Sequence, residues 1–313
     1  MDAGYYANVY KRYATYLHRY GDVQPFRIAA GPYHSKDMKQ WTEVMMRDAG
    51  RMIDGLDLHY YTVVGNWQEK GSATDFAEEH WIEGIRKGLV IEEAVKAQSA
   101  IMDRYDPEKR IWLIVGEWGM WHDVEPGTNP GFLYQQSTLR DAMVAALSLN
   151  TFNRHADRVK MANIAQMVNV LQSMILTRGE QMIVTPTYHV FEMFSGHQDA
   201  TLLPIVLDES AYTHGETTIP ALNASASVND AGRVLITMAN FDPHNGRTVD
   251  VSLRGGDLSS VSGRILTADA MNAHNTFDAP NRVAPALFDG TRLSAGRLIV
   301  EIPAKAIVAL ELE

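Results

Sequence analysis

The stretch 111-IWLIVGEWGMW-121 decides how the rest of the sequence is interpreted. Five apolar residues, Ile111 to Val115, lead through Gly116 to a single carboxylate, Glu117, and two tryptophans follow within four positions. A continuous apolar run is typical of a parallel-sheet strand, because both faces of such a sheet are covered. The loops after such strands build the active sites of α/β barrels. The stretch therefore predicts a carboxylate at the mouth of a pocket, with an aromatic wall from Trp118 or Trp121. An ordinary glutamate at the start of a helix is the alternative.

Short apolar runs alternate with helical patterns across the first two thirds of the chain. Four runs predict strands, at Phe26–Gly31, Asp54–Thr62, Ile111–Val115 and Val159–Ala165. Helical spacing of apolar residues predicts helices around Gly4–Tyr20, Ser35–Ala49, Asp75–Lys87, Val90–Tyr105, Leu133–Leu149 and Gln166–Leu176. Strands that alternate with helices form right-handed βαβ units around a parallel sheet. Four of them predict half of a (β/α)8 barrel.

The pattern changes near His197. Beyond it the helical period disappears, and short alternating runs such as GRVLITMANF and RTVDVSL are separated by turn signals such as DPHNG. Several short strands at this spacing are typical of an antiparallel β-sandwich or jelly roll. The sequence therefore predicts two domains, a partial barrel over residues 1–196 and a C-terminal β-sandwich over residues 197–313.

Composition excludes several classes of partner. The 313 residues carry a formal charge of −10, which disfavours nucleic acid and anionic membrane surfaces, and no apolar run is long enough to span a bilayer. There is no cysteine, nucleotide-binding glycine loop, serine elbow or zinc-ligand spacing, so we expect no cofactor and no metal. The adjacent Glu78 and Glu79 of EEHW are interpreted as a solvated helix face. The N-terminus lacks a secretory pattern, which predicts a cytoplasmic protein.

A second polar pattern lies in the predicted strand LDLHYY. Asp57, His59 and Tyr61 share one face of it, because strand side chains alternate. Polar groups on a buried strand need partners, and the mouth of an active site supplies them. A lone histidine here would more often be a buried core residue whose ring nitrogens are hydrogen-bonded to neighbouring groups. His59 and Tyr61, however, approach the end of a strand that should neighbour the strand of Glu117. A tyrosine hydroxyl that donates to this carboxylate would orient it and favour its ionised form, as a nucleophile requires.

Four motifs carry a resemblance to a known family. GLDLHYYT, GEWGMW, HADRVKMANIAQMVNVLQSMILT and TPTYHVFEMFSGHQDA resemble the bacterial α-L-arabinofuranosidases of glycoside hydrolase family 51, and the likeness covers nearly the whole chain. The resemblance implies a (β/α)8 barrel followed by a C-terminal jelly roll, in a homo-oligomer. It also implies a retaining hydrolase without a cofactor. Such an enzyme removes terminal α-L-arabinofuranosyl units from arabinoxylan, arabinan or derived saccharides, in L-arabinose metabolism and hemicellulose degradation.

The resemblance also implies roles for individual residues. Glu117 matches the nucleophile, Tyr61 matches the tyrosine that hydrogen-bonds it, and His59 lies beside them. Gln166 matches a glutamine that contacts the sugar hydroxyls, with a helix-capping amide as the alternative. Trp121 matches an aromatic residue of the pocket wall.

One departure from the family pattern concerns the second catalytic carboxylate. The family's acid/base glutamate follows an asparagine at the end of barrel strand four, shortly before a helix that resembles MDAGYYANVYKRYATYL, with which this sequence begins. We therefore expect strands five to eight here, and the acid/base residue in an N-terminal barrel half from the same gene product or a separate chain. Glu125 is a remote alternative acid. Alone, the 313 residues are expected to be inactive, and either poorly soluble or self-associating.

A smaller departure lies in GEWG, where several relatives have Asp and Asn in place of Gly116 and Gly119. Two other functions stay open. One is a non-catalytic carbohydrate-binding or assembly remnant. The other is a different retaining glycosidase of the same barrel clan.

Overall fold

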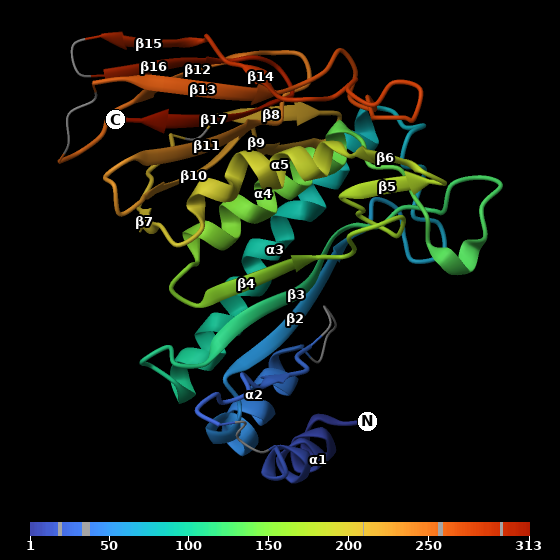
Figure 1. Ribbon diagram of the computed structural model, residues 1–313, viewed down its shortest axis with the longest axis vertical. Helices are drawn as coiled ribbons and strands as arrows, with labels where there is room; N and C mark the ends of the chain where they lie inside the picture. The colour runs from blue at the N-terminus through green and yellow to red at the C-terminus, as the bar shows by residue number, and fades with distance from the viewer. Residues whose placement is uncertain (18–20, 33–37, 209, 256–258, 295–296) are drawn as a thin grey trace. The chain divides into compact units, whose positions relative to one another are not determined.

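The computed structural model describes residues 1–17, 21–32, 38–208, 210–255, 259–294 and 297–313 (Figure 1). They form two compact units between which the chain passes several times. Unit 1 consists of Met1–Tyr61, Val90–Trp118 and His155–Ile164, and unit 2 consists of Thr62–Leu89, Gly119–Arg154 and Ala165–Glu313. None of the described helices has both the length and the apolar character needed to cross a membrane.

A four-stranded sheet forms the centre of unit 1. Its strands, in spatial order, are β1 (Ile28–Ala29), β2 (Gly55–Thr62), β3 (Trp112–Met120) and β4 (Val159–Ile164). The β1–β2 and β3–β4 ladders are both parallel. Figure 1 shows β2, β3 and β4 side by side. The four predicted strands are confirmed, although β3 continues past its predicted end to Met120.

The helices of unit 1 follow the predicted order. Helix α1 spans Ala3–Thr15 and begins at Asp2, whose side chain accepts the Tyr5 N–H at 2.8 Å as an N-cap. Helix α2 spans Met38–Ala49, and a short 3-10 helix, η1 (Gly50–Met52), follows it. The predicted end of the first helix at Tyr20 and the predicted start of the second at Ser35 lie outside the described residues.

The buried Arg158 holds the start of β4 to the preceding elements of unit 1. Its guanidinium donates to the Asp106 carboxylate and to the Ile111 carbonyl, both at 2.9 Å, and it also pairs with Asp103. Arg158 is 1% exposed, so these partners replace the water that an ionised group would otherwise need.

The prediction of two helices separated at Gly88 is wrong, because α3 is continuous over Glu78–Tyr105. A Cβ atom at Gly88 would lie 3.3 Å from Val144 Cγ1 on α4 (Leu139–Arg154). Gly88 therefore permits close helix packing and does not end the helix. Helix α4 also begins later than predicted, since Leu133 has a φ of 53°, in the left-handed region.

The predicted helix over Gln166–Leu176 is wrong too. An irregular loop follows β4 and leads into the hairpin of β5 (Ile175–Arg178) and β6 (Gln181–Val184). Asn169 and Leu171 have φ values of 56° and 43°, which an α-helix does not accommodate. The Asn169 side chain accepts the Thr177 N–H at 2.8 Å and so joins the loop to the hairpin.

Beyond helix α5 (Pro186–Phe194) and the 3-10 helix η3 (Ser195–His197), every described element is a strand. A six-stranded antiparallel sheet has the order β14-β13-β17-β11-β10-β7, a three-stranded sheet the order β12-β16-β15, and β8 and β9 form a hairpin. The strands are β7 (Thr201–Leu203), β8 (Ala211–His214), β9 (Thr217–Pro220), β10 (Leu222–Val228), β11 (Val234–Asn240), β12 (Arg247–Val251), β13 (Val261–Leu266), β14 (Ala286–Leu287), β15 (Thr291–Ser294), β16 (Arg297–Ile302) and β17 (Ala306–Leu312).

The two larger sheets share one apolar core. Leu298, Val300 and Ile302 of β16 are buried in the same cluster as Ile236 of β11 and Leu310 of β17. Inward-facing side chains of two packed sheets are the defining feature of a β-sandwich. The predicted change to an antiparallel β-sandwich is therefore confirmed.

Helix α4 packs against the six-stranded sheet (Figure 1). Buried side-chain hydrogen bonds attach the helix to the sheet. The side-chain Oδ1 of Asn150 accepts hydrogen bonds from the hydroxyls of Ser225 on β10, at 2.8 Å, and Thr237 on β11, at 2.7 Å. At the other end of the sheet, the Trp81 indole of α3 donates to the Phe241 carbonyl at 2.9 Å. Buried polar groups that are paired in this way stabilise one particular packing of helix on sheet.

His197 makes the stability of unit 2 depend on pH. Its ring nitrogens lie 2.7 Å from Ser227 Oγ and 2.9 Å from Thr237 Oγ1, and burial lowers the pKa of His197 from 6.5 to about 4. The unfolded chain therefore binds more protons than the folded one at intermediate pH. The stabilisation is complete above pH 6.5 and is lost as the pH falls toward 4. We expect His197 to remove about 2 kcal/mol of unfolding free energy between pH 7 and pH 5.

Urea unfolding of the wild type and His197→Gln at both pH values measures this contribution. The variant should lose less stability than the wild type on acidification, and the exposed His80→Gln control should behave as the wild type. Equal losses in all three proteins would show that His197 does not cause the pH dependence.

Candidate active site

Glu117 lies inside β3, so the prediction that it follows the end of a strand is wrong. The β3–β4 register shows why its side chain is nevertheless presented. Val115 pairs with Ala162 and Trp118 with Ile164, so Gly116 and Glu117 together oppose one residue of β4. This is a β-bulge, which re-aims a side chain within a sheet. The Glu117 side chain is 43% exposed, whereas Trp118 is 1% exposed and cannot serve as a pocket wall.

Tyr61 and His59 of β2 both reach the Glu117 carboxylate. The Tyr61 hydroxyl donates to Glu117 Oε2 at 2.7 Å, and His59 Nδ1 lies 3.5 Å from the same oxygen. The predicted juxtaposition of these three residues is thus present. A phenol donor at this distance fixes the carboxylate orientation while its other oxygen remains available for reaction.

Asp57 extends this arrangement into the sheet. Its carboxylate accepts from His59 Nε2 at 2.7 Å and from the Gly116 N–H at 3.0 Å. A Cβ atom at Gly116 would lie only 2.2 Å from Asp57 Oδ1, so the contact requires glycine there. The hydrogen bond to Asp57 is the main reason that the pKa of His59 is raised, and the charge of Glu117 adds to it. The imidazolium form of His59 is therefore stabilised between two carboxylates.

Trp121 belongs to unit 2 and forms an aromatic pair with Trp67. The ring centroids are 5.3 Å apart and nearly perpendicular, and the Lys70 ammonium lies 5.3 Å from the Trp121 centroid. Trp67 is 45% exposed and was not found from the sequence. The signal that could have found it is its position in the loop after β2, where barrel active sites place their residues.

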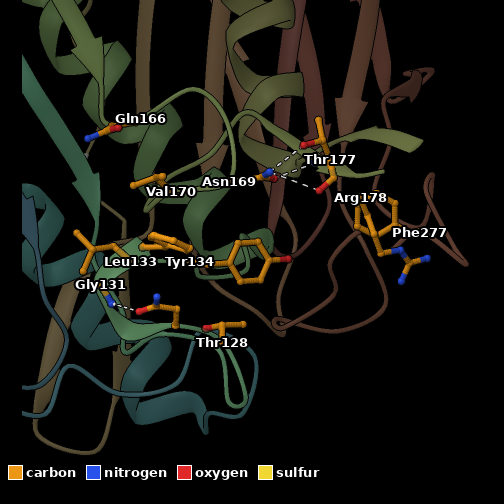
Figure 2. A pocket seen from close by; sticks show the side chains of 12 residues that line it. Thr128, Gly131, Leu133, Tyr134, Gln166, Asn169, Val170, Thr177, Arg178 and Phe277 are labelled. Atoms are coloured by element: carbon orange, nitrogen blue, oxygen red, sulfur yellow. Dashed lines mark hydrogen bonds between the residues drawn. The ribbon is translucent and has the colours of Figure 1, made fainter. Parts of the chain in front are cut away.

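Gln166 is exposed and lies two residues beyond the end of β4. It lines a cavity of about 730 Å³ in unit 2 together with the 128–134 loop, the β5 end and Phe277 (Figure 2). The alternative in which Gln166 caps a helix is wrong, since no helix begins there.

Asp141 of α4 holds the loops that carry Trp121 and Gln166. Asp141 Oδ1 accepts from His122 Nε2 at 2.8 Å and from Gln172 Nε2 at 3.0 Å, and Oδ2 accepts the Thr138 N–H at 2.7 Å. His122 follows Trp121 directly, and the Gln172 N–H donates to the Ala165 carbonyl at 3.1 Å. Burial lowers the pKa of His122, so its ring is neutral and donates from Nε2. No sequence pattern indicated this network.

The prediction that the EEHW segment forms a solvated helix face is wrong at Glu78. Glu78 does not lie on a solvated face, because its carboxylate accepts from the Tyr212 hydroxyl and from His244 Nε2, both at 2.7 Å. These contacts join the start of α3 to the strand region of unit 2. Within the described ranges, no three or more His, Asp or Glu side chains are grouped in a way that could hold a metal ion.

A family model, a relative and a solved structure give consistent matches to this chain. The family model for the α-L-arabinofuranosidase C-terminal domain matches residues 116–306. An intracellular exo-α-L-arabinofuranosidase of Bacteroides ovatus is 46% identical over 314 residues, which cover 100% of this chain and 61% of that protein. The crystal structure of a family 51 arabinofuranosidase from Xanthomonas axonopodis pv. citri has a TM-score of 0.97 and 47% identity, with 100% of this chain and 63% of that chain covered.

The chain therefore spans about three fifths of the length of these relatives, 61% and 63%. A thermostable family 51 enzyme from Thermotoga petrophila shares the fold at 22% identity and a TM-score of 0.76. The resemblance seen in the sequence motifs is confirmed over the whole chain, which belongs to the α-L-arabinofuranosidases of glycoside hydrolase family 51.

Proposed function

We propose that this chain carries the nucleophile of a retaining α-L-arabinofuranosidase that removes terminal α-L-arabinofuranosyl units from arabinan- and arabinoxylan-derived saccharides. The observation that carries the proposal is the 2.7 Å hydrogen bond from Tyr61 to a bulge-presented Glu117. The Bacteroides ovatus relative is named an exo-α-L-arabinofuranosidase, which supports the substrate class. A Streptomyces lividans relative, 26% identical over 88% of this chain, is named for the α-(1→5) linkage.

In this proposal β1 to β4 are strands five to eight of a (β/α)8 barrel. Residues 1–196 form the partial barrel and residues 197–313 a C-terminal jelly roll. The four-stranded order β1-β2-β3-β4, with parallel ladders at both ends, supports the barrel assignment. Strands one to four would come from the region of the relatives that this chain does not span.

Glu117 would attack the anomeric carbon of the arabinofuranosyl unit and form a glycosyl ester, while the bond to the leaving oxygen breaks. Retaining glycosidases place a second carboxyl group about 5–5.5 Å from the nucleophile, which protonates that oxygen and then deprotonates the attacking water. Asp57 is a poor candidate for this acid, because it already accepts from His59 and from the Leu58 and Gly116 N–H groups. We therefore assign the acid/base residue to the barrel half outside these 313 residues.

The family resemblance assigns sugar binding to Gln166 and Trp121. Gln166 would donate to and accept from arabinose hydroxyls, and Trp121 would present its ring to an apolar sugar face. Lys70 beside the Trp67–Trp121 pair would keep the indoles in place by cation–π attraction. Two carboxylates suffice for this chemistry, so the proposal includes no cofactor. It places the enzyme in the cytoplasm as a homo-oligomer that acts in L-arabinose metabolism.

The complete gene product that carries these residues provides the test. It should hydrolyse 4-nitrophenyl α-L-arabinofuranoside with retained anomeric configuration, read by NMR, and should prefer it strongly to the β-D-xyloside. The separately expressed 313 residues should show little hydrolysis of natural arabino-oligosaccharides, since general acid catalysis contributes about 10²–10⁴-fold. A preference for the xyloside would favour another glycosidase of the clan. Sugar binding without hydrolysis by the complete protein would favour the non-catalytic alternative.

Tyr61→Phe should lower kcat/KM for the aryl arabinofuranoside by about 10- to 100-fold, because one hydrogen bond to a charged group is lost. Steady-state kinetics of the complete gene product measure the effect, with Tyr16→Phe on an exposed side chain as the matched control. An unchanged kcat/KM in Tyr61→Phe would show that the observed hydrogen bond does not contribute to catalysis.

A further inference from the structure

One carboxylate on β2 contacts both the side chain and the backbone that lie next to Glu117. Asp57 Oδ2 accepts from His59 Nε2 at 2.7 Å, and Asp57 Oδ1 accepts the Gly116 N–H at 3.0 Å. All four residues lie in unit 1, on the neighbouring strands β2 and β3 (Figure 1). Asp57 therefore reaches the surroundings of the nucleophile by two separate routes.

The two carboxylates beside the His59 ring can only accept hydrogen bonds from it. An ionised carboxylate has no proton to donate, so Nε2 must carry the proton that bonds to Asp57. In a neutral ring, Nδ1 would then present a lone pair to Glu117 Oε2, which lies 3.5 Å away. Two acceptors that face each other repel, whereas an imidazolium carries a proton on both nitrogens. The arrangement therefore favours a charged His59.

The groups around His59 support its charged form. Among the described residues, the charged groups that face it are Asp57 on its own strand and Glu117 on β3, with Tyr61 next along β2. The hydrogen bond to Asp57 is the largest cause of the raised pKa of His59; burial opposes it, and the two carboxylate charges add to it. Without the Asp57 charge, His59 would lose its proton at a lower pH.

The second route depends on the residue directly before the nucleophile. A Cβ atom at Gly116 would lie 2.2 Å from Asp57 Oδ1 and 2.9 Å from Asp57 Cγ, so any side chain there would displace the carboxylate. Gly116 also belongs to the bulge that presents Glu117. The carboxylate that orients His59 therefore also holds the backbone from which the nucleophile projects.

A positive charge beside Glu117 matters most when the glycosyl ester breaks down. In that step, water attacks the anomeric carbon and gives its proton to the acid/base residue, while the bond to the Glu117 oxygen breaks and its electron pair returns to the carboxylate. The returning charge faces His59 and the Tyr61 hydroxyl, which lies 2.7 Å from Oε2. Charged groups that are already in place stabilise such a transition state without reorganisation.

We propose that Asp57 is a positioning residue for the nucleophile, which holds His59 as an imidazolium beside Glu117 and fixes the backbone at Gly116. The inference rests on the proposed function, in which Glu117 forms and releases the glycosyl ester. Asp57 acts through these two neighbours, whereas Tyr61 bonds to the nucleophile directly.

Asp57→Asn separates the charge of this residue from its contacts with the backbone. The amide oxygen can still accept the Leu58 and Gly116 N–H groups, which Asp57 Oδ1 accepts at 2.9 Å and 3.0 Å. The amide nitrogen replaces the acceptor that faces His59 with a donor. Nuclear magnetic resonance of ¹⁵N-labelled histidine in the complete gene product, assigned with His59→Gln, reads the ring directly. The titration midpoint of His59 should fall by about one pH unit or more, and Nε2 should lose its proton.

Gly116→Ala perturbs the same contact from β3. It should lower the His59 midpoint in the same direction, and it should add little to the change in Asp57→Asn, because both substitutions remove one interaction. Asp54→Asn is the matched control, since it removes a carboxylate just before β2 that is paired with Arg27 at 3.1 Å. The control should leave the His59 midpoint at its wild-type value.

Hydrolysis of 4-nitrophenyl α-L-arabinofuranoside by the complete gene product measures the consequence for catalysis. Asp57→Asn should lower kcat about tenfold or more and should lower KM with it, because slow breakdown of the ester lets the glycosyl-enzyme accumulate. A burst of about one nitrophenol per chain should precede the steady state. A defect confined to folding would reduce the amount of active protein and leave KM unchanged.

The two measurements separate this inference from the proposed function. If the wild type hydrolyses no arabinofuranoside, the proposed function fails, and the titration still decides whether Asp57 holds His59 in its charged form. If the wild type is active and Asp57→Asn leaves kcat and KM unchanged, the positioning role is overturned, whatever the midpoint of His59.

Discussion

Glu117→Ala is expected to lower kcat for aryl α-L-arabinofuranosides by about 10⁴-fold or more in the complete gene product, as removal of a covalent nucleophile does elsewhere. Tyr61 and His59 orient this carboxylate from the neighbouring strand, at 2.7 Å and 3.5 Å from Glu117 Oε2. Alanine leaves those two groups in place and removes only the atom that would attack. The loss should therefore appear in kcat and leave the fold intact.

Added azide distinguishes a lost nucleophile from a damaged site. The anion would occupy the space of the missing carboxylate, attack the anomeric carbon and yield a glycosyl azide with inverted configuration, while the aryl oxide leaves. Glu108→Ala, an exposed glutamate shortly before β3, is the matched control and should leave kcat close to that of the wild type. Near-normal turnover in Glu117→Ala would remove this residue from the mechanism.

Asp141→Ala should be among the most destabilising single substitutions in unit 2, with a cost of about 3–5 kcal/mol in unfolding free energy. Asp141 and His122 are both 0% exposed, and Asp141 is also the charge partner of the buried Arg140. Its removal leaves Arg140 buried with only neutral partners. It also leaves Thr138, His122 and Gln172 without their common acceptor. Unsatisfied buried donors cost free energy that no nearby water recovers.

Urea unfolding at pH 7, followed by far-ultraviolet circular dichroism, measures this cost. Asp157→Ala is the matched control, because it removes a partly exposed partner of Lys109, and such surface pairs contribute less than about 1 kcal/mol. A cost for Asp141→Ala as small as that of the control would mean that the buried network does not stabilise unit 2.

Much of the fold could be predicted because its strands carry strong local signals. The run Ile111–Val115 and the LDLHYY strand are continuous or patterned enough to identify β3 and β2 without tertiary information. The errors arose where tertiary contacts override local preference. Gly88 looked like a helix stop, yet the close approach of Val144 explains the glycine inside a continuous helix. The segment after β4 has helical spacing, but Asn169 bonds to Thr177 and adopts a left-handed conformation.

Part of the candidate site could also be predicted from the sequence. Glu117, His59 and Tyr61 could be grouped because they lie on strands expected to be neighbours. The bulge that presents Glu117 depends on the β3–β4 register, which no local pattern specifies. Trp67 could have been found from its position in the loop after β2. Asp141 and the cavity beside Gln166 could not be found, because their partners are distant in sequence and their residue types are common in loops and cores.

Covalent labelling is the sharpest test of Glu117 as the nucleophile of a retaining arabinofuranosidase. An arabinofuranose-configured cyclitol aziridine alkylates a nucleophilic carboxylate through ring opening, and peptide mass spectrometry locates the new ester. We expect one label per chain of the complete gene product, on the peptide that contains Glu117, and no label in Glu117→Gln. A label on another carboxylate such as Asp57 or Glu125, or undiminished labelling of Glu117→Gln, would contradict it.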